Sequence, residues 1–287
     1  MAQSPTHKFG QIIGEVLEAA IREPLGRVAR KHRLFLDFKH PRAARGGRRK
    51  VAWRDHKGNT HDLDYVLEEG GSDEKVGRPR AFIEIAWRRY TKHPRNKAQE
   101  IQGAIAPLAE TYACDRPFLG VVLAGVFTQG AITQLASQGF GVLYFPYSAV
   151  TRAFRAVGID AVFEESSSDA EVRKKVDAYG SLSESQKATI ARVLRSVCRR
   201  DIHAFLARLE TSLNRRIRLI VVLPLHGSPH TSRTAADAIG FIRSYDRSPA
   251  APKFVRFELS IRYTNGDEIL ANFEARSDAI AFLQRVT

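Results

Sequence analysis

Cysteine and long apolar runs are both scarce in this sequence. Its two cysteines, Cys114 and Cys198, lie far apart and form no CxxC pair, so neither a disulfide framework nor a cysteine-based zinc site is expected. The most apolar stretch, residues 118–127, is too short to cross a membrane. The N-terminus has no apolar run of the kind found in signal peptides. These absences favour a cytoplasmic protein with no membrane association.

Negative charge is also scarce. The chain carries 45 Lys and Arg against 31 Asp and Glu, which gives a formal net charge of +14 and a pI near 10.1. This balance favours a polyanionic partner, chiefly nucleic acid, because basic side chains neutralise phosphates and release counterions. The alternative is a basic surface that is merely solvated.

The N-terminal half has an ordered succession of patterns. Apolar residues at helical spacing predict a helix over residues 9–31, with Pro24 kinking or interrupting it. The following segments are then expected: a strand at 34–38, a basic glycine-rich loop at 41–50, part of a strand at 51–53, two acidic strands, a helix at 96–112, a strand at 118–126, a helix at 129–138, a strand at 141–145 and a helix at 150–156. This order predicts an α/β fold.

The two acidic strands, residues 61–68 and 82–89, are the most informative segment. Since side chains alternate across a strand, Asp62, Asp64, Val66 and Glu68 are expected on one face of the first, and Glu84, Ala86 and Arg88 on one face of the second. If the strands pair, their carboxylates converge. Like charges that close together favour a hard divalent cation with oxygen ligands.

This arrangement resembles the PD-(D/E)XK nuclease superfamily, which includes many restriction endonucleases. Its members carry an Asp at a strand end, a Glu-x-Lys on the next strand and often a Glu on an upstream helix. Here Asp64 matches the Asp, with Asp62 as an alternative, Glu84 matches the strand Glu, and Glu15 or Glu18 matches the helical Glu. The resemblance covers about residues 8–160 and implies an αβββαβ core, in which helices flank a mixed sheet.

The resemblance also implies residue roles. Asp64 and Glu84, with Glu15 or Glu18, are the expected ligands of Mg²⁺ or Mn²⁺. Ala86 stands where the superfamily has its Lys. Three explanations remain open: Ala86 is an inactivating replacement, the domain binds without cutting, or the charge comes from elsewhere. In the third case Arg88 or Lys97 supplies the charge, and Gln99 is a polar helper.

Two basic segments are expected to contact DNA. Arg42, Arg45, Arg48 and Arg49 belong to the glycine-rich loop, which we interpret as a mobile arm that reaches the backbone or a groove. Arg89 and Lys92 belong to residues 87–97, a segment directly after Glu84 that is dense in phosphate-binding groups.

The sequence changes character after a polar stretch at residues 164–169. This stretch predicts a boundary between domains 1–165 and 166–287. The second part begins with a basic helical segment at 183–214 and ends in a β-α-β-β-α pattern typical of a small α/β domain. Asn265-Gly266 predicts a hairpin there, and Ser277 is expected to cap the last helix.

The function that these patterns and the resemblance favour is a metal-dependent endonuclease that hydrolyses DNA phosphodiester bonds, in restriction or phage defence. It is expected to act as a homodimer or as part of a defence complex. The alternative is a non-catalytic DNA-binding or assembly subunit on the same fold.

Overall fold

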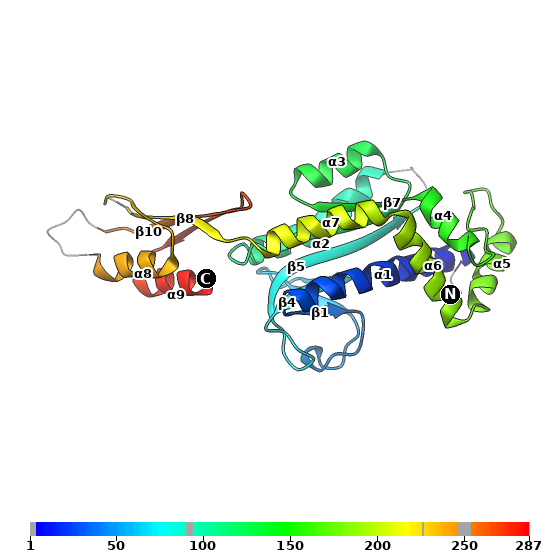
Figure 1. The fold of residues 1–287 in the computed structure, drawn as a ribbon, viewed down its shortest axis with the longest axis horizontal. Coiled ribbons are helices and arrows are strands. Elements are labelled where there is room, and N and C mark those ends of the chain that lie inside the picture. The colour runs from blue at the N-terminus through cyan, green and yellow to red at the C-terminus, as the bar shows by residue number, and fades with distance from the viewer. Residues whose placement is uncertain (1–3, 90–93, 226, 246–253, 287) are drawn as a thin grey trace. The chain divides into compact units, whose positions relative to one another are not determined.

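The structure, a computed structural model, describes residues 4–89, 94–225, 227–245 and 254–286 (Figure 1). The chain divides into two compact units. Unit 1 comprises residues 1–111 and 117–210, and unit 2 comprises residues 112–116 and 211–287. The division after residue 210 differs from the boundary expected at residue 165.

Unit 1 is an α/β structure. Its helices are α1 (Pro5–Lys31), the short 3₁₀ helix η1 (Ala43–Arg45), α2 (Pro94–Thr111), α3 (Gln129–Ser137), α4 (Tyr147–Arg155), α5 (Asp169–Gly180), α6 (Glu184–Val197) and α7 (Arg199–Leu213). Its strands are β1 (Leu34–Phe38), β2 (Val51–Arg54), β3 (Thr60–Leu63), β4 (Tyr65–Glu69), β5 (Arg78–Arg88), β6 (Phe118–Gly125) and β7 (Gly141–Pro146).

A five-stranded mixed sheet forms the centre of unit 1, in the order β1-β4-β5-β6-β7. β4 is antiparallel to both β1 and β5, whereas β5, β6 and β7 are parallel. Helices α2 and α3 join the parallel strands, because a parallel connection needs a crossover. The long strand β5 is the cyan arrow that runs along helix α1 in Figure 1. The expected mixed sheet flanked by helices is thus present.

Different elements cover the two faces of this sheet. Adjacent strand residues point to opposite faces, so Phe82 and Ile83 of β5 distinguish the two layers. Phe82 packs edge-on against Trp53 of β2, with ring centroids 5.3 Å apart, and α2 contacts both β3 and β5. Ile83 abuts Gly120 of β6, and so does Phe205 of α7. The β2–β3 hairpin and α2 therefore cover one face, and α7 covers the other.

Helix α1 lies on the same face as α7. Tyr65 of β4 pairs with Ile83, and its hydroxyl donates to the backbone carbonyl of Glu18 at 2.7 Å. The helix runs unbroken through Pro24, which is buried, and Ser4 caps its start. The interruption that we allowed for at Pro24 is therefore wrong, because α1 is continuous from Pro5 to Lys31.

Helices α5, α6 and α7 belong to unit 1 because they pack on its core. Both α5 and α6 contact α1, and α6 also contacts α4. The polar stretch at residues 164–169 leads into helix α5 and is not a domain boundary. Ser168 accepts from the backbone N–H of Glu171, and the Glu171 side chain accepts from the N–H of Ser168, which is a capping box.

The segment expected as one acidic strand is two strands in two sheets. β3 pairs with β2 in a two-stranded sheet, and β4 joins the five-stranded sheet. The chain bends at Asp64 between them. Asp62 therefore does not share a face with Asp64, and it pairs instead with Lys50 at 2.5 Å.

Unit 2 is a small α/β structure. It contains β8 (Ile217–Pro224), β9 (His230–Ser232), α8 (Ala235–Ser244), β10 (Phe257–Tyr263), β11 (Glu268–Phe273) and α9 (Arg276–Arg285). Its antiparallel sheet has the order β11-β10-β8-β9, and residues from α8 and α9 complete its core.

The hairpin expected at Asn265-Gly266 is present, with Gly266 at a φ of +91° that favours glycine. The cap expected at Ser277 is wrong: α9 begins at Arg276 after Ala275, and the Ser277 hydroxyl lies 3.1 Å from the Asp278 carboxylate.

Candidate functional site

Asp64 and Glu84 occupy opposing positions at the end of the β4–β5 ladder. Tyr65 pairs with Ile83, so Asp64 and Glu84 are the next residues in register. The Asp64 Oδ2 atom accepts the backbone N–H of Ile85 at 2.6 Å. This bond holds the Asp64 side chain against the strand that carries Glu84, so the structure brings these two expected ligands together.

Glu84 faces the layer of the β2–β3 hairpin and α2, because it alternates with Ile83 and shares the face of Phe82. Its side chain is half-buried, and its Oε2 atom is shielded from solvent. A shielded carboxylate oxygen is costly to keep charged unless hydrogen bonds or a cation stabilise it. Strand β5, which carries Glu84, is the middle strand of the five-stranded sheet.

The two carboxylates suit a hard divalent ion. Asp64 Oδ2 accepts the backbone N–H of Ile85, and carboxylate oxygens are the ligands that hard divalent ions prefer. Mg²⁺ is commonly held by only one or two carboxylates and completes its coordination with water and substrate phosphate oxygens. Because neighbouring carboxylates repel each other, such an ion also relieves the repulsion between them.

The helical glutamates lie apart from this pair to different degrees. Glu18 is half-buried, and its pKa is raised by burial, which Lys39 and Arg22 oppose. The charges of Glu18 and Asp64 both raise the pKa of Tyr65, so Glu18 lies near the same end of the sheet as Asp64. Glu15 is exposed, and its charge helps to raise the pKa of Tyr179 of α5 and of Lys187 of α6.

Glu18 is therefore the better of the two alternatives for a helical acid. Within the described part of the chain, no three His, Cys, Asp or Glu side chains gather closely enough to form a ready-made ligand group. Of the expected ligands, the structure thus brings Asp64 and Glu84 together.

The residues expected to replace the missing Lys, or to assist it as polar groups, differ in how exposed they are. Ala86 is buried on the face of Glu84, and Arg88 follows two residues later at the end of β5 and is half-buried. Gln99 is exposed on α2. The side chain of Lys97 lies outside the described residues.

Arg42 is not part of a mobile arm. Its side chain is fully buried and donates to Glu68 at 2.6 and 3.0 Å, to the carbonyls of Ser72 and Lys75, and pairs with Asp37 at 2.7 Å. Burial alone lowers the pKa of Arg42, but Glu68 and Asp37 outweigh it and the pKa is raised. The expected DNA contact of Arg42 is wrong, because its guanidinium is enclosed by these partners.

Arg45 is also held inside the loop. Its guanidinium donates to the carbonyls of Phe38, His40 and Arg49 and lies 3.2 Å from Asp37. Only 7% of its side chain is exposed. Arg45 therefore cannot reach out to a duplex as the mobile-arm interpretation requires.

Arg48 and Arg49 remain available at the surface. Both are exposed, and Arg48 is anchored by a single bond from its Nε to the Arg45 carbonyl at 3.2 Å. The expected DNA contacts of this loop therefore rest on Arg48 and Arg49.

The expected contact of Arg89 with DNA is not supported by its position. Its guanidinium donates to the Phe163 carbonyl and the Glu164 carboxylate and stacks 4.1 Å from the Tyr147 ring. Only 12% of its side chain is exposed. Arg89 ties β5 to the segment before α5, and Lys92 lies outside the described residues.

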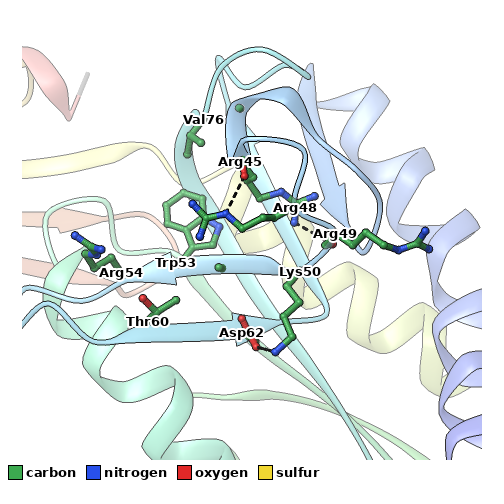
Figure 2. A pocket seen from close by; sticks show the side chains of 11 residues that line it. Arg45, Arg48, Arg49, Lys50, Trp53, Arg54, Thr60, Asp62 and Val76 are labelled. Atoms are coloured by element: carbon green, nitrogen blue, oxygen red, sulfur yellow. Dashed lines mark hydrogen bonds and ion pairs between the residues drawn. The ribbon is translucent and has the colours of Figure 1, made fainter.

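A pocket of about 550 Å³ lies between the loop at residues 44–50 and the β2–β3 hairpin. Figure 2 shows Arg54 and Thr60 toward one end of the hairpin and Lys50 and Asp62 toward the other. Its lining residues are Ala44, Arg45, Arg48, Arg49, Lys50, Ala52, Trp53, Arg54, Thr60, Asp62 and Val76. The lining thus contains five cationic side chains and one carboxylate, but the Arg45 guanidinium turns to Asp37, and Figure 2 shows Arg49 pointing away from the hairpin.

The alternation along residues 51–54 is the sequence signal for the strand that lines this pocket. Val51, Ala52, Trp53 and Arg54 alternate between buried and exposed, as in a strand with one covered face. The strand that precedes Asp64 pairs with it and brings Thr60 and Asp62 to the same side as Ala52 and Arg54.

No protein-family model, curated protein or solved structure matches this chain. Within the described ranges, none of the helices has the length and apolar character needed to cross a bilayer.

Proposed function

We propose that this chain is a metal-dependent endonuclease that hydrolyses DNA phosphodiester bonds. The observation that carries the proposal is the Asp64–Glu84 pair, which the β4–β5 register and the Ile85 N–H hold at one end of the mixed sheet. The net charge of +14 supports a polyanionic substrate.

The order of elements supports an αβββαβ core of the restriction-endonuclease type. Helix α1 precedes the antiparallel strands β1, β4 and β5, and α2 then leads to the parallel strand β6. In this arrangement Asp64 precedes the second core strand and Glu84 lies on the third. The β2–β3 hairpin is an insertion between the first two core strands.

The two carboxylates would hold Mg²⁺ or Mn²⁺, which supplies an activated water and stabilises charge on the phosphate. Asp64 keeps its position through the Ile85 N–H, and Glu84 presents its oxygens from the neighbouring strand. Glu18 would assist from α1, and Arg88 or Lys97 would stabilise the phosphate in place of the missing Lys. Arg48 and Arg49 would hold the DNA backbone.

Cleavage of DNA tests this proposal. Plasmid and linear duplexes, unmodified and methylated, are incubated with Mg²⁺ or Mn²⁺, with and without a chelator. Metal-dependent nicking that Glu84→Ala abolishes is the expected result. Glu110→Ala, which removes an exposed acid from α2, is the matched control and should leave nicking unchanged.

A non-catalytic DNA-binding or assembly subunit on the same fold is the second candidate. The observation that favours it is Ala86, a buried methyl at the position where the superfamily has its Lys. This candidate predicts salt-sensitive DNA binding without cleavage under any metal condition. Restriction or phage defence is the setting that we propose for either candidate, as a homodimer or in a defence complex.

A further inference from the structure

We propose that the face of the unit 2 sheet opposite α8 and α9 binds the same face of a second copy of this chain. Helices α8 and α9 lie on one side of this sheet, where they contact β8, β9 and β11 (Figure 1). The strand residues that turn to these helices include Ile220, Val222, Leu259 and Ile261, which belong to the core. Because side chains alternate along a strand, the residues between them point to the other side.

The opposite face consists of three rows of residues that cross the strands. The central row is Leu270, Ser260, Val221 and Thr231, one residue from each of β11, β10, β8 and β9. The flanking rows are Glu268, Arg262 and Leu219 on one side, and Asn272, Glu258 and Leu223 on the other. Each of the three rows therefore contains at least one apolar side chain.

This face presents apolar surface to solvent. Leu270 is 75% exposed, and Leu219, Val221 and Leu223 of β8 are half-buried. Only the small Ser260 lies between Leu270 and Val221 in the central row. A sheet face with apolar residues is stabilised when a second layer covers it, so this face favours a protein partner.

The charge of the face favours another protein surface over a nucleic acid. The flanking rows and the adjoining Arg256 carry two ion pairs, Arg256–Glu258 at 2.6 Å and Arg262–Glu268 at 3.1 Å. Two cations and two carboxylates cancel here, although the whole chain has a net charge of +14. A neutral face gains nothing from phosphate neutralisation, which dominates binding to DNA.

The register makes this face complementary to itself. A two-fold axis along the central row lays each strand over its own counterpart and exchanges the two flanking rows. Arg262 then faces Glu258 of the partner subunit, and Leu219 faces the partner's Leu223. Leu270 meets its own counterpart. Sheets that pack face to face keep their strand directions within about 30° of each other, which this arrangement allows.

Sedimentation equilibrium of the full chain, freed of nucleic acid and kept in chelator, measures the association. Four strands about 4.8 Å apart give a face roughly 19 Å wide, which is small for an interface. We therefore expect a weak dimer, with a Kd on the order of 10 µM. Leu270→Glu should weaken it at least about 100-fold, because the symmetry removes two leucines and opposes two carboxylates. Arg243→Glu reverses an exposed charge on α8 and is the matched control, which should have no effect.

The charge pair provides a test that a general loss of folding cannot imitate. Arg262→Glu alone and Glu258→Arg alone should each weaken the dimer at least about tenfold, because each substitution opposes like charges at two symmetric contacts. An equimolar mixture of the two variants should associate about as tightly as the unmodified chain. In the mixed dimer, both contacts again join opposite charges.

Three results would overturn the inference. The first is a monomeric chain at about 100 µM, roughly ten times the expected Kd. The second is a loss of association in Arg243→Glu as large as that in Leu270→Glu. The third is a dimer that neither charge reversal weakens, or that mixing does not restore. Pairing of β11 edges would give this third result, because Arg262 and Glu258 lie on β10.

The inference names a surface for the proposed homodimer and does not depend on the nuclease proposal. The measurements contain neither DNA nor metal, so a failure of DNA cleavage leaves them unaffected. A monomeric chain that still nicks DNA would overturn this inference and leave the nuclease proposal standing.

Discussion

Arg42 and Glu68 form a two-pronged ion pair, at 2.6 and 3.0 Å, in which neither side chain is exposed to solvent. Asp37 lies 2.7 Å from the same guanidinium. This pair joins the loop after β1 to strand β4, so it supports the fold and does not contact a ligand.

Removal of Arg42 should therefore destabilise the protein strongly. Arg42→Ala leaves Glu68 and Asp37 buried without their partner, which typically costs about 3–5 kcal/mol. Urea unfolding of unit 1 measures this loss. Arg49→Ala, an exposed neighbour, should change stability by less than about 0.5 kcal/mol. Equal stability of the two variants would contradict the structural role of Arg42.

The Asp64 carboxylate accepts the backbone N–H of Ile85 and is also proposed to bind the metal ion, and two variants separate these roles. Asp64→Asn keeps an oxygen that can accept the Ile85 N–H but loses the charge, whereas Asp64→Ala loses both. We expect Asp64→Ala to lower the free energy of unfolding by about 1–3 kcal/mol and Asp64→Asn to lower it much less. Both variants should lose Mn²⁺ binding in calorimetry. Undiminished Mn²⁺ binding by Asp64→Asn would remove Asp64 from the metal site.

Glu84→Ala should abolish the binding of a divalent ion without weakening the metal-free fold, because it relieves repulsion from Asp64. Calorimetry with Mn²⁺ and thermal unfolding in chelator are the two measurements. A marked fall in the melting temperature in chelator would show that Glu84 stabilises the fold through other partners.

A lysine at position 86 tests whether the missing charge limits catalysis. Ala86→Lys places the ammonium on the strand face of Glu84, two residues further along. If Ala86 is an inactivating replacement, cleavage should rise on the order of 10²–10³-fold. If the charge comes from elsewhere, the unchanged chain should already cut DNA, and Arg88→Ala or Lys97→Ala should stop it. The nuclease proposal would fall if neither chain cuts any duplex.

Arg48 and Arg49 should contribute to the salt dependence of DNA binding. Neutralising both with Arg48→Gln and Arg49→Gln should reduce the slope of log K against log salt by about 2, since each phosphate contact contributes about 0.9. Arg152→Gln with Arg173→Gln removes two exposed cations elsewhere in unit 1 and is the matched control. An unchanged slope in the first double variant would show that the loop does not touch DNA.

The raised pKa of Glu18 gives stability a defined dependence on pH. Burial raises the pKa above its usual value of 4.5, so the folded state holds a proton more firmly than the unfolded state. Its contribution is complete below pH 4.5 and is lost as the pH rises through the folded pKa. Glu18→Gln should flatten this decline in urea unfolding between pH 4 and pH 7. A decline of the same size in the variant would assign it to another group.

Much of the fold was predictable because local patterns specify it. The helical spacing in α1 and the apolar run of β6 both agree with the structure, as does the Asn265-Gly266 turn. The sequence also indicated that the two acidic segments would bring their carboxylates together if they paired, and β4 pairs with β5.

The predictions that the structure contradicts concern interactions between residues distant in the sequence. Alternation continues across Asp64, so the sequence does not show that the chain enters a different sheet there. The burial of Arg42 depends on Glu68, 26 residues away, which a glycine-rich basic loop does not reveal. The capping box at Ser168 has the composition of a linker, and only the packing of α5 on α1 distinguishes the two.

The change of sheet at Asp64 restricts how the length of this segment can vary. Leu63 belongs to the hairpin and Tyr65 to the central sheet, so a single residue spans the two. An inserted residue here would either turn the side chains of β4 to the wrong face or move the carboxylate away from the Ile85 N–H. Insertions should therefore be tolerated at the tip of the hairpin, around Gly58, and not between its second strand and β4.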